Sequence, residues 1–404
     1  MKSDNGLASA YMQLLLGGLN GKREELPSTA VRGSILDCAD GALNALRRIA
    51  SDNLLPGISG SALLTERAKL LGFSNPGQVS ANGTCRLIQT ETGWLALNLA
   101  REEDWDLVPA WLEVQVDSGD WQSIASMVRR RCCVDLVDRG RLMGLPVTVV
   151  DSFHAEHWFS VQRNGKPAGS RGSSPLVIDL SSLWAGPLCS HLLLHAGATV
   201  IKVESSTRPD STRVTSPEFH DLINSGKYSV MLDLEKTKDI SKLAMLLRRA
   251  DIVIESARPR GLRHMGISAE DLVDHTPGLT WVSITGYGRN EPEANWVAFG
   301  DDAAIAAGAA VETGSGPGFV GDAVSDPLTG IHAAITALAG WQSGVGSLID
   351  ISLAGVTCFI LKAAGGASGI NLEADLTPRA AGSAAPILGH DTDEVFKEFV
   401  DPCY

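Results

Sequence analysis

The sequence of 404 residues contains no long apolar run, no excess of basic residues and no Cys-x-x-Cys pair. A membrane-spanning helix needs about 20 apolar residues, so we expect no membrane span, and the apolar run near the N-terminus is too short for a signal peptide. The net charge of −13 argues against nucleic acid and anionic membranes as partners. The 7 cysteines are scattered and odd in number, which is typical of a reduced, cytoplasmic protein.

The stretch PLVIDLSSLWAGPLCSHLLLHAGATVIKVE, residues 175–204, organises the rest of the chain. Residues 176–180 form a short apolar run typical of a buried strand. Leucines then recur at helical spacing until Gly197, and a second apolar run follows at 198–203. This βαβ unit requires a parallel sheet with a right-handed crossover. It lacks Gly-x-Gly-x-x-Gly and so gives little support to NAD binding, but the end of its first strand is where open α/β sheets bind ligands.

We predict an α/β protein in which a large Rossmann-like domain with a parallel sheet is joined to a smaller α+β domain placed N-terminally. The hydrophobic content of 44% and charged content of 20% fit a globular enzyme. Residues 1–165 are expected to form the N-terminal helices and the small domain, residues 166–174 (KPAGSRGSS) a linker, and residues 175–404 the large domain with a C-terminal helix. Two strands are expected within residues 85–100, on either side of a Glu-Thr-Gly turn, and further strands at 227–234, 251–255, 279–285 and 347–353. Helices are expected at 34–49, 62–71, 101–114, 121–142, 240–249, 327–340 and, capped by Asp391, 392–400.

Several motifs, in order, resemble family III CoA-transferases: DLSSLWAGPLCSHLLLHAGATVIKVE, NSGKYSVMLDL, ADIVIESARP, SITGYG and SDPLTGIHAAITALAG. This family includes formyl-CoA and carnitine CoA-transferases and α-methylacyl-CoA racemases. The resemblance covers residues 176–353 and implies an acyl-CoA:carboxylate CoA-transferase of carboxylic acid or lipid metabolism. It implies an acyl-CoA and a carboxylic acid acceptor as partners, coenzyme A thioester as substrate, no permanently bound cofactor and an interlocked homodimer.

The N-terminal motifs TGWLALNLAREEDWDLV and GLPVTVV resemble the small domain of the same family. In most members this domain follows the strand that corresponds to residues 348–353, whereas here it precedes the large domain. The resemblance therefore implies a circularly permuted chain. Such a rearrangement is physically tolerable when the joined ends lie close together on the surface.

Asp326 is the candidate catalytic residue. Taken alone, Ser325-Asp326-Pro327 is a helix start with Asp as the N-cap and Pro at the first helical position. The resemblance aligns Asp326 with the catalytic aspartate of the family, which attacks the thioester and forms an acyl-aspartyl anhydride. Both roles are compatible, because a helix N-terminus keeps a carboxylate ionised and fixes its direction.

Candidate CoA-binding positions lie at the ends of predicted strands, where cations suit phosphate groups. Without the resemblance, such side chains are more often solvated surface charges. His264 stands where other members often carry Arg, and Ser256 replaces a common Asn. The resemblance implies CoA binding by Asn224, Lys227, Ser256, Arg258 and His264.

An acyl pocket is implied at the other end of CoA. Trp184 taken alone would be a core residue, but the family position faces the acyl group, where an indole would restrict its size. The expected acyl-pocket residues are Trp184, Ala185, Gly286 and Asp301. The loop at 75–83 is a further candidate, as the glycine loop that covers the anhydride.

Two histidine pairs have spacings that occur in metal sites, but neither has a carboxylate or Cys companion. His191 and His195 stand four apart on a predicted helix, and His154 and His157 three apart. Packing or surface roles are therefore favoured, and we expect no metal site.

Two other functions compete with the transferase hypothesis. An α-methylacyl-CoA racemase needs a second base, usually His, on the opposite face of the α-carbon. No His occurs between His275 and His332, and Asp301 is the conceivable substitute. A non-catalytic CoA-binding subunit is the third possibility, since the permutation and the altered CoA-site residues allow it.

Overall fold

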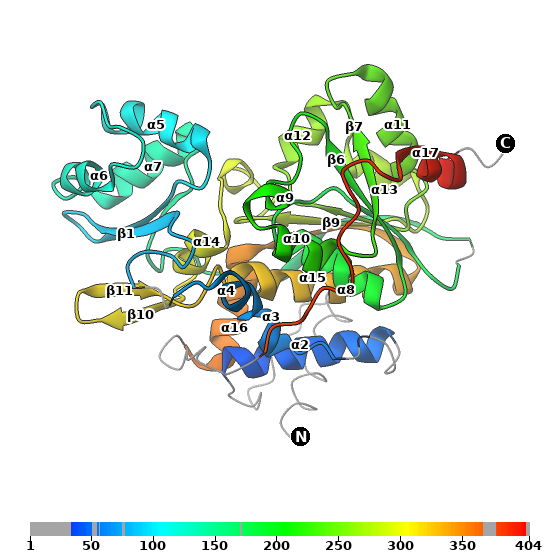
Figure 1. The fold of residues 1–404 in the computed structure, drawn as a ribbon, viewed down its shortest axis with the longest axis horizontal. Coiled ribbons are helices and arrows are strands. Elements are labelled where there is room, and N and C mark those ends of the chain that lie inside the picture. The colour runs from blue at the N-terminus through cyan, green and yellow to red at the C-terminus, as the bar shows by residue number, and fades with distance from the viewer. Residues whose placement is uncertain are drawn as a thin grey trace.

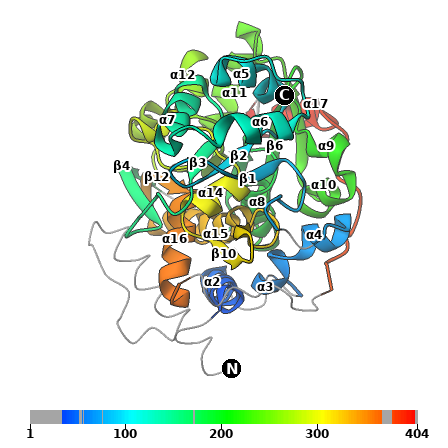
Figure 2. The same ribbon diagram turned by 90° about the vertical axis from the view of Figure 1, so that its left-hand side faces the viewer.

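The computed structural model describes residues 34–50, 55, 57–74, 77–169, 172–366 and 377–400. Its larger part is a seven-stranded sheet with helices on both faces, and a smaller part holds a three-stranded antiparallel sheet covered by helices (Figure 1). A short two-stranded hairpin lies beside the smaller part (Figures 1 and 2). This architecture confirms the predicted α/β class.

The large sheet has the strand order β4-β12-β9-β8-β5-β6-β7. All neighbours pair in parallel except the edge strand β4, which is antiparallel to β12. The large sheet is made of β4 (Phe159–Pro167), β5 (Leu176–Asp179), β6 (Thr199–Ser205), β7 (Tyr228–Leu232), β8 (Ile252–Glu255), β9 (Thr280–Thr285) and β12 (Val345–Ser352). The smaller sheets are made of β1 (Cys85–Gln89), β2 (Trp94–Asn98) and β3 (Val147–Val149), and of β10 (Ala310–Thr313) and β11 (Gly316–Phe319).

The helices fall into three groups by their neighbours. The N-terminal segment supplies α2 (Ile35–Ala50), α3 (Gly60–Leu63) and α4 (Glu66–Leu71). The three-stranded sheet is covered by α5 (Glu102–Leu112), α6 (Trp121–Val128) and α7 (Cys133–Met143). The remaining helices are α8 (Ala185–His195), α9 (Thr212–Thr215), α10 (Pro217–Asn224), α11 (Thr237–Leu247), α12 (Pro259–His264), α13 (Ala269–His275), α14 (Gly300–Ala306), α15 (Ser325–Ser343), α16 (Leu353–Ala364) and α17 (Thr392–Val395), which continues into one π-helical turn (Phe396–Val400).

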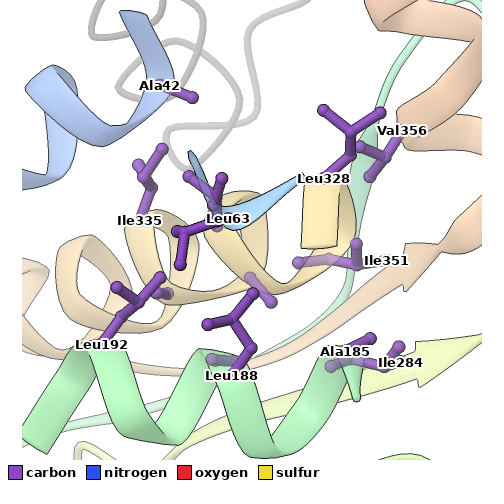
Figure 3. Close-up of a cluster of buried hydrophobic side chains, with 14 of the residues drawn as sticks. Ala42, Leu63, Ala185, Leu188, Leu192, Ile284, Leu328, Ile335, Ile351 and Val356 are labelled. Atoms are coloured by element: carbon purple, nitrogen blue, oxygen red, sulfur yellow. The ribbon is translucent and has the colours of Figure 1, made fainter. Parts of the chain in front are cut away.

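Alternate residues of the central strands enter two different cores, as a sheet buried on both faces requires. Val177 of β5 packs in the core that contains α2, α8, α15 and α16, whereas the next residue, Ile178, packs with α11, α12 and α13. Figure 3 shows Leu188 and Leu192 of α8 on one side of α15 and Ala42 of α2 on the other. The strands therefore read as continuous apolar runs because both of their faces are covered.

The central helix α15 packs very closely on α8. A Cβ atom at Gly330 would lie 2.9 Å from the carbonyl oxygen of Ala185, so this contact requires glycine. The approach brings the first turns of α8 and α15 together, and it is these turns that form the candidate site.

The smaller part contacts the rest of the chain mainly through α14. Asn98 at the end of β2 donates a 3.0 Å hydrogen bond from Nδ2 to the buried carboxylate of Asp302 in α14. All residues of α14 are buried, and most of them are small.

Packing assigns two N-terminal segments to the large sheet rather than to the smaller part. α2 packs against α15, and β4 pairs with β12. Lys166 and Pro167 therefore belong to a strand and not to the predicted linker. The division into domains at 165 and 175 remains a prediction.

Other expected elements differ in detail from the structure. The helix expected at 121–142 is interrupted between α6 and α7, where the Cys133 N–H donates to the Thr92 hydroxyl at 2.9 Å. The helix at 62–71 is likewise divided into α3 and α4. Asp391 occupies the N-cap position of α17 as expected, but its carboxylate accepts the Ser229 N–H at 2.7 Å and no N–H of the helix. Residues 1–33, the start of the loop at 75–83 and the middle of the predicted linker lie outside the described residues.

Candidate functional site

A pocket of about 470 Å³ lies at the carboxyl ends of the central strands. The chain proceeds from β5 to β6 and β7 on one side, and β8 and β9 then lie on the other side of β5. The carboxyl ends of β5 and β8 thus form the switch point at which open α/β sheets bind ligands. Ser182 and Leu183 follow β5, and the segment 256–261 follows β8; all of them line the pocket.

Asp326 lines this pocket from the first turn of α15. The helix begins two residues earlier than expected, with Val324 as its N-cap, so Asp326 is not the capping residue. Its carboxylate accepts backbone N–H groups of Ala185, the first residue of α8, and of Gly300, the first residue of α14. Three helix N-termini therefore converge on one carboxylate, an arrangement that favours negative charge.

The space around Asp326 is closely fitted. A Cβ atom at Gly300 would lie 2.3 Å from Asp326 Oδ2, so a larger residue would displace the carboxylate. Burial raises the pKa of Asp326 to about 7. The cation of Arg67 opposes this rise in pKa, and the nearby carboxylate of Asp322 adds to it. The pocket thus contains a carboxylate that changes its charge close to neutral pH.

Two residues that flank this carboxylate have left-handed backbone conformations without being glycine. Leu183 has a φ of 72° and Ala323 a φ of 43°. The Leu183 N–H donates to Asp210, and the Ala323 N–H donates to Asp301 Oδ1 at 3.0 Å. Such strained residues persist only where surrounding contacts fix them, and they concentrate at functional sites.

Of the ten site residues expected from the sequence, Asp326, Ala185 and Gly286 line the pocket. The expected CoA-binding residues Ser256, Arg258 and His264 line it as well. The structure brings these six together from β5–α8, β8–α12, β9 and α15.

Asn224 and Lys227 do not line the pocket, and their expected contact with CoA is not supported. Lys227 is 3% exposed, and its Nζ donates to Asp179, to the Pro187 carbonyl at 2.9 Å and to Asn224 Oδ1 at 2.8 Å. Both side chains belong to a buried network below α8. The Gly-Lys turn that suggested phosphate binding instead inserts the lysine into the protein interior.

Trp184 and Asp301 lie behind the pocket wall rather than in it. Trp184 is 1% exposed and packs edge-to-face on Phe219, so it is a core residue. Asp301 is buried, and Asp322 and Arg67 lie close enough to act on its charge. Burial raises the pKa of Asp301 to about 8. Its Oδ1 accepts the Ala323 N–H and the residue does not line the pocket, so its position does not favour the role of second base that racemisation would require.

Three arginines of the pocket were missed by the sequence analysis. Arg101, Arg208 and Arg260 line it together with Arg258. Burial lowers the pKa of Arg258, and the other three cations lower it further. Arg260 could have been found from its place beside Arg258, but no local signal marks Arg101, which precedes α5 in the smaller part. This cationic wall, defined as Arg101, Arg208, Arg258 and Arg260, occurs in a chain of net charge −13 and suits a polyanionic ligand.

Apolar side chains form much of the rest of the pocket. They come from the end of β9, from the segment before α14 and from the start of α16. These residues are Ile284, Trp296, Val297, Ala298, Phe299 and Leu353. A ligand that reaches from the cationic wall to Asp326 would therefore combine negative charge with an apolar part.

The described residues lack two features. No helix among them is long and apolar enough to cross a membrane. No group of three or more His, Cys, Asp or Glu side chains in the described part of the chain is arranged to hold a metal ion.

Comparison with known proteins places this site in a family. CoA-transferase family III matches residues 175–392, more than half of the chain. A succinate–glutarate CoA-transferase of Agrobacterium fabrum is 33% identical over 205 residues, which cover 46% of this chain and 51% of that protein. A formyl-CoA:oxalate CoA-transferase of Escherichia coli is 32% identical over 199 residues, covering 45% and 48%. The chain thus spans about half the length of the curated relatives it matches.

A solved structure of a CAIB/BAIF family protein from Brucella suis is similar over 55% of this chain and 62% of its own, with 27% identity and a TM-score of 0.44. The match to the family covers the large sheet from β5 to β12 and includes Asp326. The chain belongs to CoA-transferase family III.

Proposed function

We propose that this protein transfers CoA from an acyl-CoA thioester to a carboxylic acid, with Asp326 as the nucleophile. The observation that carries the proposal is the position of the Asp326 carboxylate. It lies at three helix N-termini, in a pocket that also presents four arginines. The names of the relatives, which are CoA-transferases acting on carboxylic acids, support the same reaction class.

The pocket suggests how an acyl-CoA would bind. The arginines of the cationic wall, with His264, would hold the phosphate groups, because guanidinium groups form charge-assisted hydrogen bonds with phosphate. The apolar residues around Leu353 and Ile284 would contact the acyl end. The thioester carbonyl would then lie near Asp326, which is the geometry that an attack requires.

The proposed reaction passes through two anhydrides and one CoA thioester of Asp326. An Asp326 oxygen attacks the thioester carbonyl, the C–S bond breaks, and CoA leaves as thiolate, giving a mixed anhydride. The thiolate attacks the Asp326 carbonyl, which releases the donor carboxylate and leaves Asp326 as a CoA thioester. The acceptor carboxylate attacks this thioester, its C–S bond breaks, and CoA leaves again as thiolate, which gives a second anhydride. Attack of the thiolate on the acceptor acyl group then gives the new acyl-CoA and restores Asp326.

Two further parts of the proposal are the circular permutation of the chain and its assembly into a homodimer. The smaller part, with β1–β3 and α5–α7, contributes Arg101 to the pocket, as a small domain of this family placed before the large one would do. We therefore retain the circular permutation as a proposal, and we retain the homodimer as a proposal that rests on the resemblance to the family. Size measurement of the purified protein in solution tests the second.

The decisive test is mass spectrometry of protein incubated with a panel of acyl-CoAs that includes succinyl-, glutaryl- and formyl-CoA, followed by hydroxylamine. We expect hydroxylamine to modify the peptide that contains Asp326, and we expect no modification in Asp326→Ala. Asp393→Ala is the matched control, since Asp393 also lies in the first turn of a helix, but on the exposed α17. It should react like the wild type.

Two other outcomes would replace the proposal. Exchange of the α-proton of a branched acyl-CoA with solvent deuterium, without any adduct, would establish racemase chemistry. Binding of CoA with neither adduct nor exchange would establish a non-catalytic CoA-binding subunit.

A further inference from the structure

We propose that Arg67 is a positioning residue that holds Asp326 charged and directed into the pocket, acting through Asp322 and Trp184. The inference rests on the proposed role of Asp326. Arg67 lies in α4, outside the part of the chain that matches the family, so its role is argued from the structure alone.

Arg67 is fixed in one orientation by two partners. Its guanidinium donates from Nε to Asp322 Oδ2 at 2.7 Å and from Nη2 to Asp322 Oδ1 at 2.5 Å. The same group stacks over the Trp184 ring, 4.2 Å from its centroid. The Arg67 side chain is 14% exposed and that of Asp322 is 1% exposed. A two-point carboxylate contact combined with stacking leaves the guanidinium little freedom, which lysine could not reproduce.

These two partners are the segments that hold Asp326. Trp184 directly precedes Ala185, whose N–H donates to the Asp326 carboxylate. Asp322 lies one turn before Asp326, next to the strained residue Ala323, whose carbonyl accepts the Asp326 N–H at 2.9 Å. A single guanidinium therefore joins the start of α8 to the start of α15.

The charges around Asp326 give Arg67 a second effect. The carboxylates of Asp301, Asp302 and Asp322 lie close enough to interact with Asp326 or with Arg67. Burial and Asp322 raise the pKa of Asp326, whereas Arg67 lowers it. Because an anhydride forms only from the ionised carboxylate, Arg67 keeps the nucleophile reactive at lower pH.

The test is the pH dependence of the rate at which an acyl-CoA modifies Asp326, measured by rapid quenching with hydroxylamine between about pH 5 and 9. In Arg67→Met the midpoint of the profile should rise by roughly 1 to 3 pH units, the effect of removing a nearby opposite charge. In Asp322→Asn the midpoint should fall, because a like charge is removed. Arg67→Lys keeps the charge without the two-point contact, so its midpoint should remain close to that of the wild type while the maximal rate decreases.

Arg379→Met is the matched control. Arg379 forms a two-point contact with Glu66, also in α4, and the exposures of this pair, 14% and 0%, are nearly those of the Arg67 pair. Its loss should weaken the fold to a similar extent without moving the midpoint.

The outcomes separate this inference from the proposed function. A wild-type protein that forms no adduct on Asp326 would refute the proposed function. An adduct in the wild type, combined with an unchanged midpoint in Arg67→Met, would refute only the role of Arg67. A midpoint that rises equally in Arg379→Met would show that general loosening of α4 is the cause and would likewise refute it. If Arg67→Met does not fold, the midpoint of the pH profile in Asp322→Asn decides. A midpoint that rises or stays unchanged in this variant would refute the inference.

Discussion

Asp179 and Asp326 are two carboxylates that both contact α8, and they differ in what surrounds them. Asp179 accepts hydrogen bonds from Ser181 and from Ser190 Oγ at 2.5 Å, and Lys227 Nζ lies 3.3 Å away. Burial alone would raise its pKa, but the cations of Lys227 and Lys202 and the hydrogen bonds from the two serines lower the pKa to about 2. Asp326 has two backbone N–H donors and a cation that is already bonded to Asp322, and its pKa is raised to about 7.

This difference is the one expected between a structural carboxylate and the nucleophile that we propose. Every oxygen of Asp179 is held by fixed protein groups, and the residue is fully buried. Asp326 is only partly buried and faces the pocket. A carboxylate whose oxygens are not fully occupied by protein donors, and which borders a space that admits a ligand, can contact that ligand and react with it.

The largest effect is expected from Lys227→Met, which removes a cation from the buried network around Asp179. This change leaves Asp179 buried with one cation fewer, and we expect the free energy of unfolding to fall by about 3–5 kcal/mol. Urea denaturation measures the loss. Labelling of Asp326 by an acyl-CoA, measured on the folded fraction, should be retained. Retained stability would show that Lys227 is not needed to compensate Asp179.

The pH dependence of stability should differ in sign between the two carboxylates. The folded-state pKa of Asp326 lies above its unfolded value, so this group favours the folded state below about pH 4 and the advantage is lost as the pH rises through 7. The pKa values of Asp301 and Asp302, raised by burial to about 8 and about 7, act in the same direction. Asp179, with its lowered pKa, instead stabilises the fold above about pH 4 and loses this effect as the pH falls through 2.

Asp326→Asn should therefore make the protein more stable at pH 8, relative to the wild type, by about 1–3 kcal/mol more than at pH 5. Denaturation curves of both proteins at the two pH values measure this difference. The Asp393→Ala variant should show no such difference. An equal effect of Asp326→Asn at both pH values would mean that the carboxylate is not destabilised by its burial.

The smallest expected effect is on CoA affinity and follows from comparing a cation near Asp179 with a cation of the pocket. Lys202, near Asp179, donates from Nζ to the Ser181 carbonyl at 2.8 Å and lies 3.2 Å from Asp210. Within the described residues, by contrast, no carboxylate pairs with Arg258. Arg258→Ala should therefore weaken CoA binding roughly tenfold, the loss of one charge-assisted contact. The weaker binding should also depend less on salt.

Titration calorimetry at two salt concentrations measures both effects. Arg163→Ala is the control, because Arg163 pairs with Asp274 at the edge strand β4 and does not line the pocket. Its affinity for CoA should equal that of the wild type. A similar loss in both variants would assign the effect to net charge rather than to the pocket.

Strong local patterns made much of the large sheet predictable. The apolar runs around Ile178, Ile201, Val253 and Ile349 are buried on both faces, so their composition alone indicated strands of a parallel sheet. The edge strand β4 was not recognised, because it has few buried residues and its pairing with β12 joins segments nearly two hundred residues apart. The break between α6 and α7 also depended on a contact from elsewhere in the chain, between Cys133 and Thr92.

The candidate site was predictable only where its residues lie in motifs. Ser325-Asp326-Pro327 is a recognisable helix start, and Arg258 follows a strand. Lys227 looked equivalent to Arg258, since both lie beside the end or start of a strand, but one enters the interior and the other the pocket. Sequence position could not distinguish them, because the direction of a side chain depends on the helix packed above it.

The sequence by itself determined the parallel strands of the large sheet, most of the helices, the family and the choice of Asp326, since these depend on local patterns of apolar residues and on short motifs. Only the tertiary structure decided which charges act together. The cationic wall combines Arg101, which precedes α5, with arginines that follow β6 and β8, and Arg67 reaches Asp326 from more than two hundred and fifty residues away. The physical reason is that electrostatic interactions and desolvation depend on distance in space and on burial, and neither is set by the local sequence.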